Sequence, residues 1–175
     1  MLYDKEHIEI LEPEGSDAKE VFTFFGLCSY NAQVLEEGLV NLAVGLRALK
    51  LTSLTMDDFE SLFHKMHKMT FGQLMIDIRR YVNVSAELEE EIVAVLNDRN
   101  YLTHGFFRKH DIEFTSNRGR IKMIEELRWI TKRIRNVDHE LELITHSLWE
   151  RLGATQEMFQ DELARMKVEA EQLDS

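Results

Sequence analysis

The 175-residue sequence contains one proline, one cysteine and only eight glycines. Because proline and glycine dominate turns and linkers, their scarcity favours a chain built mainly of helices. The lone Cys28 cannot form an internal disulfide, and its place in an apolar helical repeat predicts a small buried side chain. No apolar run approaches the roughly 18 residues that a membrane span needs, and residues 1–15 lack the basic and apolar blocks of a signal peptide. We therefore expect a cytoplasmic protein with no membrane partner.

Positive charge is also scarce overall. The chain has 21 Lys and Arg against 32 Asp and Glu, a net charge of −11, which disfavours a protein that coats nucleic acid. Residues 99–135 are the exception, with ten Lys and Arg against four Asp and Glu, a local balance of +6 that leaves −17 for the rest. This basic segment favours binding to an anionic partner, and the simpler alternative is the solvated face of a helix.

Two long helices are predicted from the spacing of apolar residues. The first begins at Ser16, where SDAKE has the form of an N-cap followed by first-turn acids. Its apolar residues alternate steps of four and three, which is typical of packed antiparallel helices or of a coiled coil. These residues are Val21, Phe25, Cys28, Ala32, Leu35, Leu39, Leu42, Leu46 and Leu49. Within the same helix, Gly26, Gly38 and Gly45 would allow a second helix to approach closely.

Shorter helices are predicted from Thr55 to about Met69, from Thr70 to Tyr81, and from Ser85 to the stretch RNYLTHGFF at residues 99–107. After a polar connection, HDIEFTSNRGR, the second long helix repeats the four-three pattern and is expected to pair with the first. Its apolar residues are Ile130, Ile134, Val137, Leu141, Ile144 and Leu148.

No strand-like alternation competes with these helices. The sequence therefore predicts an all-α, up-and-down bundle of about five helices, two of them long. We expect residues 1–15 to form an N-terminal arm, residues 16–153 the bundle, and residues 154–175 an acidic helical extension that packs on a partner or frays.

Metal and cofactor motifs are missing or incomplete. No histidine stands three residues after a glutamate, so the Glu-x-x-His pairs of carboxylate-bridged iron sites do not occur. His64 and His67 lie beside lysines and are expected to be a surface pair. Glu87 and Glu90 supply half of a magnesium motif whose Glu-x-x-Asp counterpart occurs further along only at residues 171–174. With no glycine-rich phosphate loop and no Gly-x-Ser-x-Gly either, we expect no metal and no cofactor.

The stretch RNYLTHGFF places an arginine, an asparagine and a histidine at the end of a late helix. This arrangement resembles the HEPN superfamily of helical domains, whose hallmark is an arginine, often followed by a polar residue, with a histidine after four to six intervening positions. Arg99, Asn100 and His104 match that pattern. The bare spacing recurs at Arg133 and His139, but that copy lacks the asparagine and lies within a helix. The resemblance covers about ten residues, with the predicted HEPN-like bundle as support.

The resemblance implies a metal-independent endoribonuclease, such as a toxin or a phage-defence component, in which the ribose 2′-hydroxyl attacks the adjacent phosphate. His104 would act as general base or acid, Arg99 would stabilise charge on the phosphoryl oxygens, and Asn100 would orient His104 or one of those oxygens. Five neighbouring side chains are expected to contact RNA: Tyr101, Arg108, Lys109, Arg118 and Arg120.

Helical geometry adds a condition to this hypothesis. Asn100 and His104 fall on one helical face, whereas Arg99 points about 140° away from His104. Since sites of this superfamily lie between two protomers, a homodimer is part of the prediction.

Two alternatives stay open. The first concerns regulation. Members of the superfamily that a partner nucleotidyltransferase silences have a tyrosine two positions after the histidine. Phe106 occupies that position here, which disfavours this modification and leaves control by a different antitoxin or regulatory protein as the alternative. The second is a non-catalytic helical dimerisation or regulatory module whose acidic surface binds a protein partner. Burial of Arg99 and His104 among local hydrogen-bond partners would favour that module.

Overall fold

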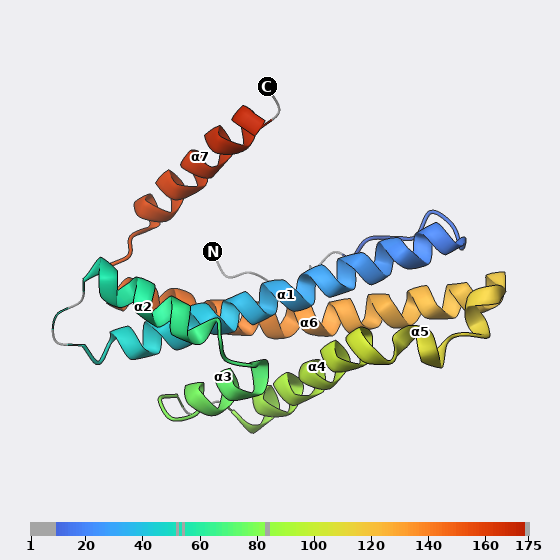
Figure 1. Cartoon of the computed structure of the whole chain (residues 1–175), viewed down its shortest axis with the longest axis horizontal. Helices are drawn as coiled ribbons and strands as arrows, with labels where there is room; N and C mark the ends of the chain where they lie inside the picture. Colours follow the sequence, from blue (N-terminus) through green and yellow to red (C-terminus); the bar gives the residue numbers. More distant parts are fainter. Residues whose placement is uncertain (1–9, 52, 54, 83–84, 174–175) are drawn as a thin grey trace.

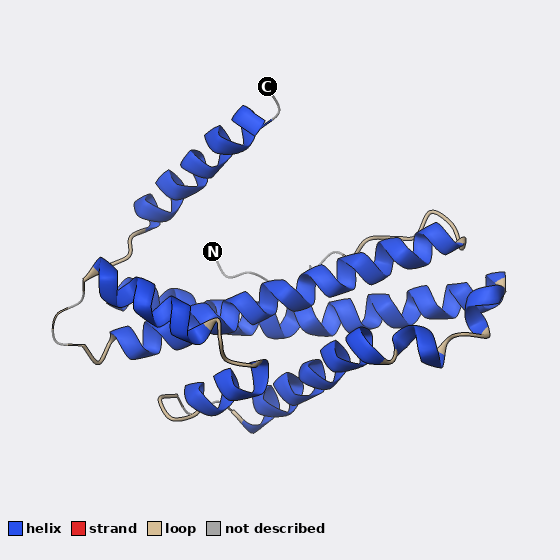
Figure 2. Cartoon of the chain, in the orientation of Figure 1, coloured by secondary structure: helices blue, strands red, loops and turns tan. Residues whose placement is uncertain are grey.

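The computed structural model describes residues 10–51, 53, 55–82 and 85–173. These residues form seven α-helices and no strand, which confirms the all-α prediction (Figures 1 and 2). No helix among them is both long and apolar enough to span a bilayer. The helices are α1 (Ala18–Ala48), α2 (Met56–Met66), α3 (Phe71–Ile78), α4 (Ala86–His104), α5 (Phe106–Lys109), α6 (Asn117–Arg151) and α7 (Gln156–Leu173).

The bundle consists of α1, α2, α3, α4 and α6, which alternate in direction along the chain (Figure 1). An odd number of alternating helices leaves the first and the fifth parallel. Accordingly, the Arg120 Nε near the start of α6 donates to the Ser16 carbonyl, 2.7 Å away, and Leu148 near its end contacts Gly45. The predicted pairing of the two long helices is confirmed, whereas the antiparallel alternative is wrong for this pair.

The core follows the predicted seam of α1. Seven of its nine apolar residues are buried, and Phe25 and Leu49 pack partly buried against the same cluster. Phe24, which lies beside the seam, is fully buried as well. Cys28 has no exposed surface, and burial raises the pKa of its thiol to about 11. Its predicted role as a small buried side chain is confirmed.

The glycines of α1 differ in what they face. A Cβ at Gly45 would lie 2.6 Å from Leu148 Cδ2, and one at Gly38 would lie 3.3 Å from Asp138 Oδ1. Both positions therefore hold α6 close to α1. At Gly26, apart from the adjoining backbone of α1 itself, no atom of the described residues lies within 4 Å of the place that a Cβ would take, so the predicted close approach is wrong there.

The predicted caps at Thr55, Thr70 and Ser85 are confirmed, whereas the cap predicted at Ser16 is wrong by one residue, because the Asp17 side chain accepts from the Glu20 amide at 2.8 Å and α1 begins at Ala18. Thr55 and Thr70 form capping boxes, and the Ser85 hydroxyl accepts from the Leu88 amide at 3.2 Å. The start of α6 differs, because Ser116 caps it and the helix already includes the last residues of the predicted polar connection. A short 3-10 turn, Glu113–Thr115, precedes that cap and packs on α6.

The long helix α6 ends at Arg151, where Gly153 adopts a positive φ of 92° that favours glycine. Helix α7 then leaves the bundle, and none of its residues is buried (Figure 1). At the other terminus, Arg128 on α6 donates to the Leu11 carbonyl at 3.1 Å. This contact holds the described end of the predicted N-terminal arm, of which residues 1–9 lie outside the described residues.

Candidate active site

Helix α4 ends at His104, and only Gly105 separates it from the single turn of α5. The Gly105 amide donates to the Tyr101 carbonyl at 2.8 Å, and a Cβ at this position would lie 3.1 Å from the Tyr101 ring. Glycine therefore lets the ring pack over the chain where it changes direction. The helix end predicted for RNYLTHGFF is confirmed.

Asn100 and His104 share the solvent-exposed face of α4, as the helical spacing predicts. Within the described part of the chain, the His104 imidazole has no hydrogen bond or ion pair, whereas the His104 backbone carbonyl accepts from the Arg108 side chain at 3.0 Å. Val93, on the same face, is 44% exposed. Both polar side chains of the motif are therefore accessible to a ligand or a second protein.

Arg99 points instead toward α1. Its Nη2 lies 3.4 Å from Glu36 Oε2, and its Nη1 donates to Asn100 Oδ1, also at 3.4 Å. The Arg99 side chain is 37% exposed, so this long ion pair contributes at most about 1 kcal/mol. Glu36 therefore orients the Arg99 side chain but holds it only weakly. The single chain does not bring Arg99 and His104 to one point.

Glu36 is the residue that the motif did not reveal. It flanks the buried Leu35 on α1 and also lines a surface pocket of about 200 Å³. The other lining residues are Gln33, Glu37, Val40, His67, Met69 and Leu74. One side of Arg99 thus borders an acidic groove between α1 and the α2–α3 connection. The only indication of Glu36 in the sequence was its position next to Leu35 in the apolar repeat of the first long helix.

Two of the predicted RNA contacts, Tyr101 and Lys109, belong to a polar cluster with His110 and Glu126. The Nε2 atom of the buried His110 lies 2.8 Å from Glu126 Oε2 and 3.1 Å from the Tyr101 hydroxyl. Lys109 Nζ contacts Glu126 Oε1 at 3.0 Å and stands 4.9 Å from the centre of the Tyr101 ring. This Glu126 cluster fastens the end of α4 and α5 to α6.

The charges of the Glu126 cluster reinforce one another. Burial alone raises the pKa of Glu126, but the hydrogen bonds from Lys109 and Tyr101 outweigh it and the pKa is lowered. The hydrogen bond to Glu126 in turn raises the pKa of Lys109. Because His110 Nδ1 is buried without a partner among the described residues, Glu126 holds the imidazole through Nε2 alone.

Replacing Glu126 by Gln is expected to lower the free energy of unfolding at neutral pH by about 1–2 kcal/mol, because it removes charge-assisted hydrogen bonds. The native pKa of Glu126 is lowered, so its contribution is present above the unfolded-state pKa and is lost as the pH falls through the native value. Urea unfolding of both proteins at neutral and acid pH should therefore show a difference that narrows in acid. A difference that widens there would contradict the assignment.

The remaining predicted RNA contacts separate into two kinds. Arg108 and Arg118 are exposed, and Arg118 makes no hydrogen bond or ion pair within the described ranges. Arg120 is engaged by the protein itself, because it donates to the Ser16 and Phe114 carbonyls at 2.7 and 3.0 Å. The Arg118 side chain is consequently free to meet an anion, Arg108 is exposed but already donates to the His104 carbonyl at 3.0 Å, and Arg120 joins the starts of α1 and α6.

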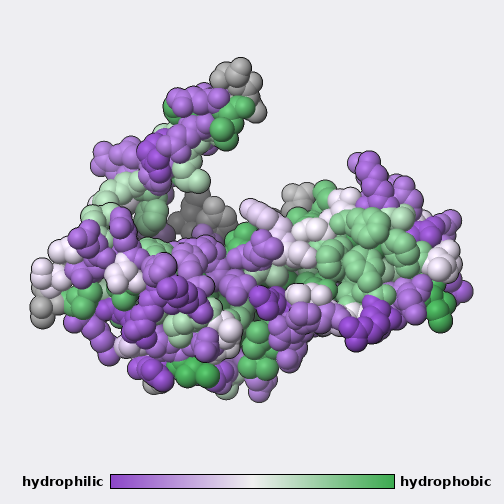
Figure 3. Space-filling view, viewed as in Figure 1, coloured by the Kyte–Doolittle hydropathy of each residue, from purple (hydrophilic) through white to green (hydrophobic). Residues whose placement is uncertain are grey.

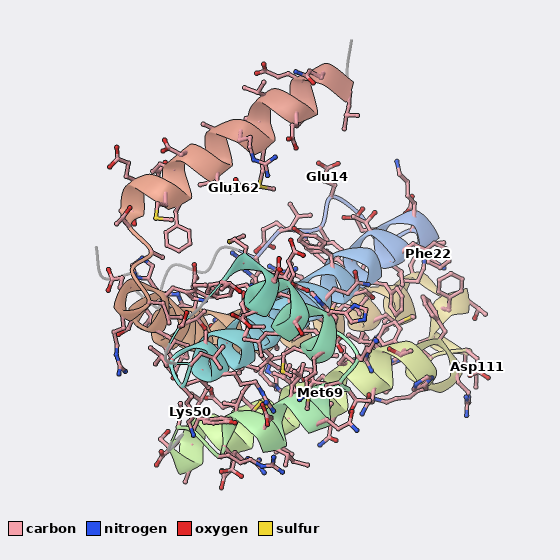
Figure 4. All side chains as sticks on the ribbon, turned by 60° about the vertical axis from the view of Figure 1, so that its left-hand side comes forward. Glu14, Phe22, Lys50, Met69, Asp111 and Glu162 are labelled. Atoms are coloured by element: carbon pink, nitrogen blue, oxygen red, sulfur yellow. The ribbon has the colours of Figure 1, made fainter. Side chains whose placement is uncertain are left out.

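An aromatic patch lies at the same end of the molecule. It consists of Phe22, Phe25, Phe107 and Phe114, whose neighbouring ring centroids are 4.9–6.1 Å apart. Phe22 is 54% exposed, while the adjacent Phe106 is buried in the core. Figure 3 shows the apolar surface at the end where α1 begins, and Figure 4 shows Phe22 and Asp111 at that end.

Within residues 10–51, 53, 55–82 and 85–173, no three His, Cys, Asp or Glu side chains converge on a point that could hold a metal ion. No family model, curated protein or solved structure matches the chain. Function is therefore inferred from the motif and from its surroundings in the structure.

Proposed function

We propose that this protein is a metal-independent endoribonuclease of HEPN type that acts in the cytoplasm as a toxin or a phage-defence component. The supporting observation is the accessibility of its motif: His104 and Asn100 are exposed, and Arg99 is held by two long contacts, with Glu36 and with Asn100, at 3.4 Å each. Burial of Arg99 and His104 among local hydrogen-bond partners would instead favour the non-catalytic module. The exposed His104 does not show that burial.

In the proposed reaction, the 2′-oxygen of a ribose attacks the adjacent phosphorus, and the bond from phosphorus to the 5′-oxygen of the next nucleotide breaks. His104 takes the proton of the 2′-hydroxyl, or as imidazolium gives a proton to the departing 5′-oxygen. Arg99 stabilises the negative charge that develops on the phosphoryl oxygens, and Asn100 orients one of them. The products are a 2′,3′-cyclic phosphate and a 5′-hydroxyl.

Two copies of the chain form the proposed site. A two-fold axis near the exposed face of α4 brings Asn100 and His104 of both copies together, and each Arg99 approaches from the edge of its helix. The exposed Val93 gives this face an apolar contact beside the polar motif. Arg108 and Arg118 then offer cations to the phosphates on either side of the scissile bond.

RNA cleavage in EDTA tests the proposal. Wild-type protein is expected to cut single-stranded RNA without a divalent ion and to leave 2′,3′-cyclic phosphate ends. These ends are detected because a phosphatase does not remove the phosphate until acid has opened the ring. His104→Ala, purified in the same way, should show only background cleavage. Equal cleavage by both proteins, or none by either across varied RNAs, would reject the ribonuclease function.

A regulatory module that binds a protein is the second candidate. The observation that favours it is α7, which exposes large apolar side chains away from the bundle. Absence of cleavage together with an intact oligomer would support this candidate, whose acidic surface would then serve recognition rather than catalysis.

A further inference from the structure

Helix α7 has an apolar seam that the described part of its own chain leaves uncovered beyond Phe159, whose ring stacks on His146 of α6 with the ring centroids 6.1 Å apart. Four apolar residues after Phe159 continue from it in steps of four, three, four and three: Leu163, Met166, Ala170 and Leu173. Phe159, Leu163, Met166 and Leu173 are 40%, 51%, 55% and 88% exposed, and no residue of α7 is buried. This spacing is the heptad pattern of a coiled coil, in which Leu163 and Ala170 take position a.

Length argues that the helix needs a partner. An isolated helix of 18 residues is only marginally stable in water, and its apolar side chains gain about 1.5–3 kcal/mol each when they are fully covered. Arg165 forms ion pairs with Glu162 and Glu169 along the helix, at 2.5 Å each, but such exposed pairs add little. Burial of the seam against a second helix supplies the larger contribution.

The charges beside the seam select the partner and its direction. Glu162 and Glu169 occupy the g positions, and Lys167 occupies an e position. In a parallel pair of identical helices, position g faces position e of the following heptad, so Glu162 meets Lys167 of the second copy. An antiparallel pair instead sets g against g, which opposes Glu162 to Glu169 of the second copy. The e position opposite Glu169 in a parallel pair is Asp174, which lies outside the described residues. Among the described flanking charges, the attraction between Glu162 and Lys167 therefore favours a second copy of α7 in parallel orientation.

We propose that α7 pairs with α7 of a second copy of this chain as a short parallel coiled coil. Figure 4 shows Glu162 on α7, set apart from the bundle. A parallel pair keeps both bundles at the same end of the coil, joined through the short connection at Gly153. The coil thereby raises the effective concentration of one bundle near the other. This inference goes beyond the proposed ribonuclease function, because it concerns assembly and requires no RNA.

The seam is tested by the mass of the full chain in solution. Sedimentation velocity over a range of protein concentrations should show a dimer of the wild type, and Leu163→Glu with Met166→Glu should raise the dimer dissociation constant at least about tenfold. The matched control, Met158→Glu with Val168→Glu, adds the same charges to exposed apolar positions outside the seam and should leave the constant unchanged. A monomeric wild type, or equal effects of the two double variants, would overturn the proposal.

A charge exchange tests the direction. Glu162→Lys should weaken a parallel dimer, because it places two lysines opposite each other, but it should strengthen an antiparallel one by facing Glu169 of the second copy. Adding Lys167→Glu should restore the wild-type dissociation constant in the parallel arrangement. Both variants lose the Glu162–Arg165 pair, so the recovery reports the contact between chains. Tighter association of Glu162→Lys alone would overturn the parallel pairing. RNA cleavage is not measured in either experiment, so failure here is distinguishable from failure of the ribonuclease proposal.

Discussion

Mixing the Arg99→Ala and His104→Ala chains is expected to restore RNA cleavage that neither variant shows alone. Removing a general acid or base costs about 10²–10⁴-fold in rate, and removing a cation that stabilises the transition state costs a similar factor. In the structure Arg99 reaches toward Glu36, whereas His104 lies on the outer face of α4. A mixed dimer contains one intact arginine and one intact histidine on different chains, so a site between chains recovers activity at least about tenfold over either variant.

The control for this experiment is the second copy of the same spacing. His139→Ala alters a histidine six residues after Arg133 within α6 and is expected to cleave like the wild type. Mass spectrometry of differently tagged chains establishes that mixed dimers have formed. If they form and the mixture cleaves no faster than its components, Arg99 and His104 act within one chain and the shared site is wrong.

Local sequence patterns predict most of the helices and their buried faces, but they do not predict the relative direction of the two long helices. The four-three spacing identifies which face of α1 is buried, and hydroxyl caps such as Thr55 and Ser85 locate helix starts. The same spacing is equally compatible with a parallel or an antiparallel neighbour. The direction of α6 depends on how many helices intervene, and that number rests on the short helices between Thr55 and Tyr81.

In the candidate site, too, features within one helix could be predicted from the sequence, whereas contacts between helices could not. The exposed face shared by Asn100 and His104 follows from helical geometry within one segment. The contact of Arg99 with Glu36 joins residues 63 positions apart. The sequence contains many other Asp and Glu residues, and nothing in it indicates which of them pairs with Arg99. Lys109 was predicted to contact RNA, and the structure pairs it with Glu126. Whether a surface cation is free depends on neighbours that only the tertiary packing brings together.

The largest loss of stability is expected from Gly119→Ala in the first turn of α6. A Cβ at this position would lie 2.1 Å from the Glu113 carbonyl oxygen and 2.5 Å from its Cα, both of them backbone atoms of the 3-10 turn. A clash with backbone cannot be relieved by a side-chain rotation, so the turn itself must move. We expect the free energy of unfolding to fall by about 3 kcal/mol, measured by urea denaturation.

The matched control is Gly26→Ala, within α1, where no described atom outside the adjoining turns of that helix lies within 4 Å of the added carbon. There alanine should stabilise the protein by about 0.5–1 kcal/mol, since it favours the helix over the unfolded chain. Opposite signs for two identical substitutions would locate the cost in the contact between Gly119 and Glu113, and equal signs would contradict it. Because the displaced turn includes Phe114, which packs on Phe107 of α5, the Gly119 variant should also disturb the aromatic patch, whereas Gly26→Ala should not.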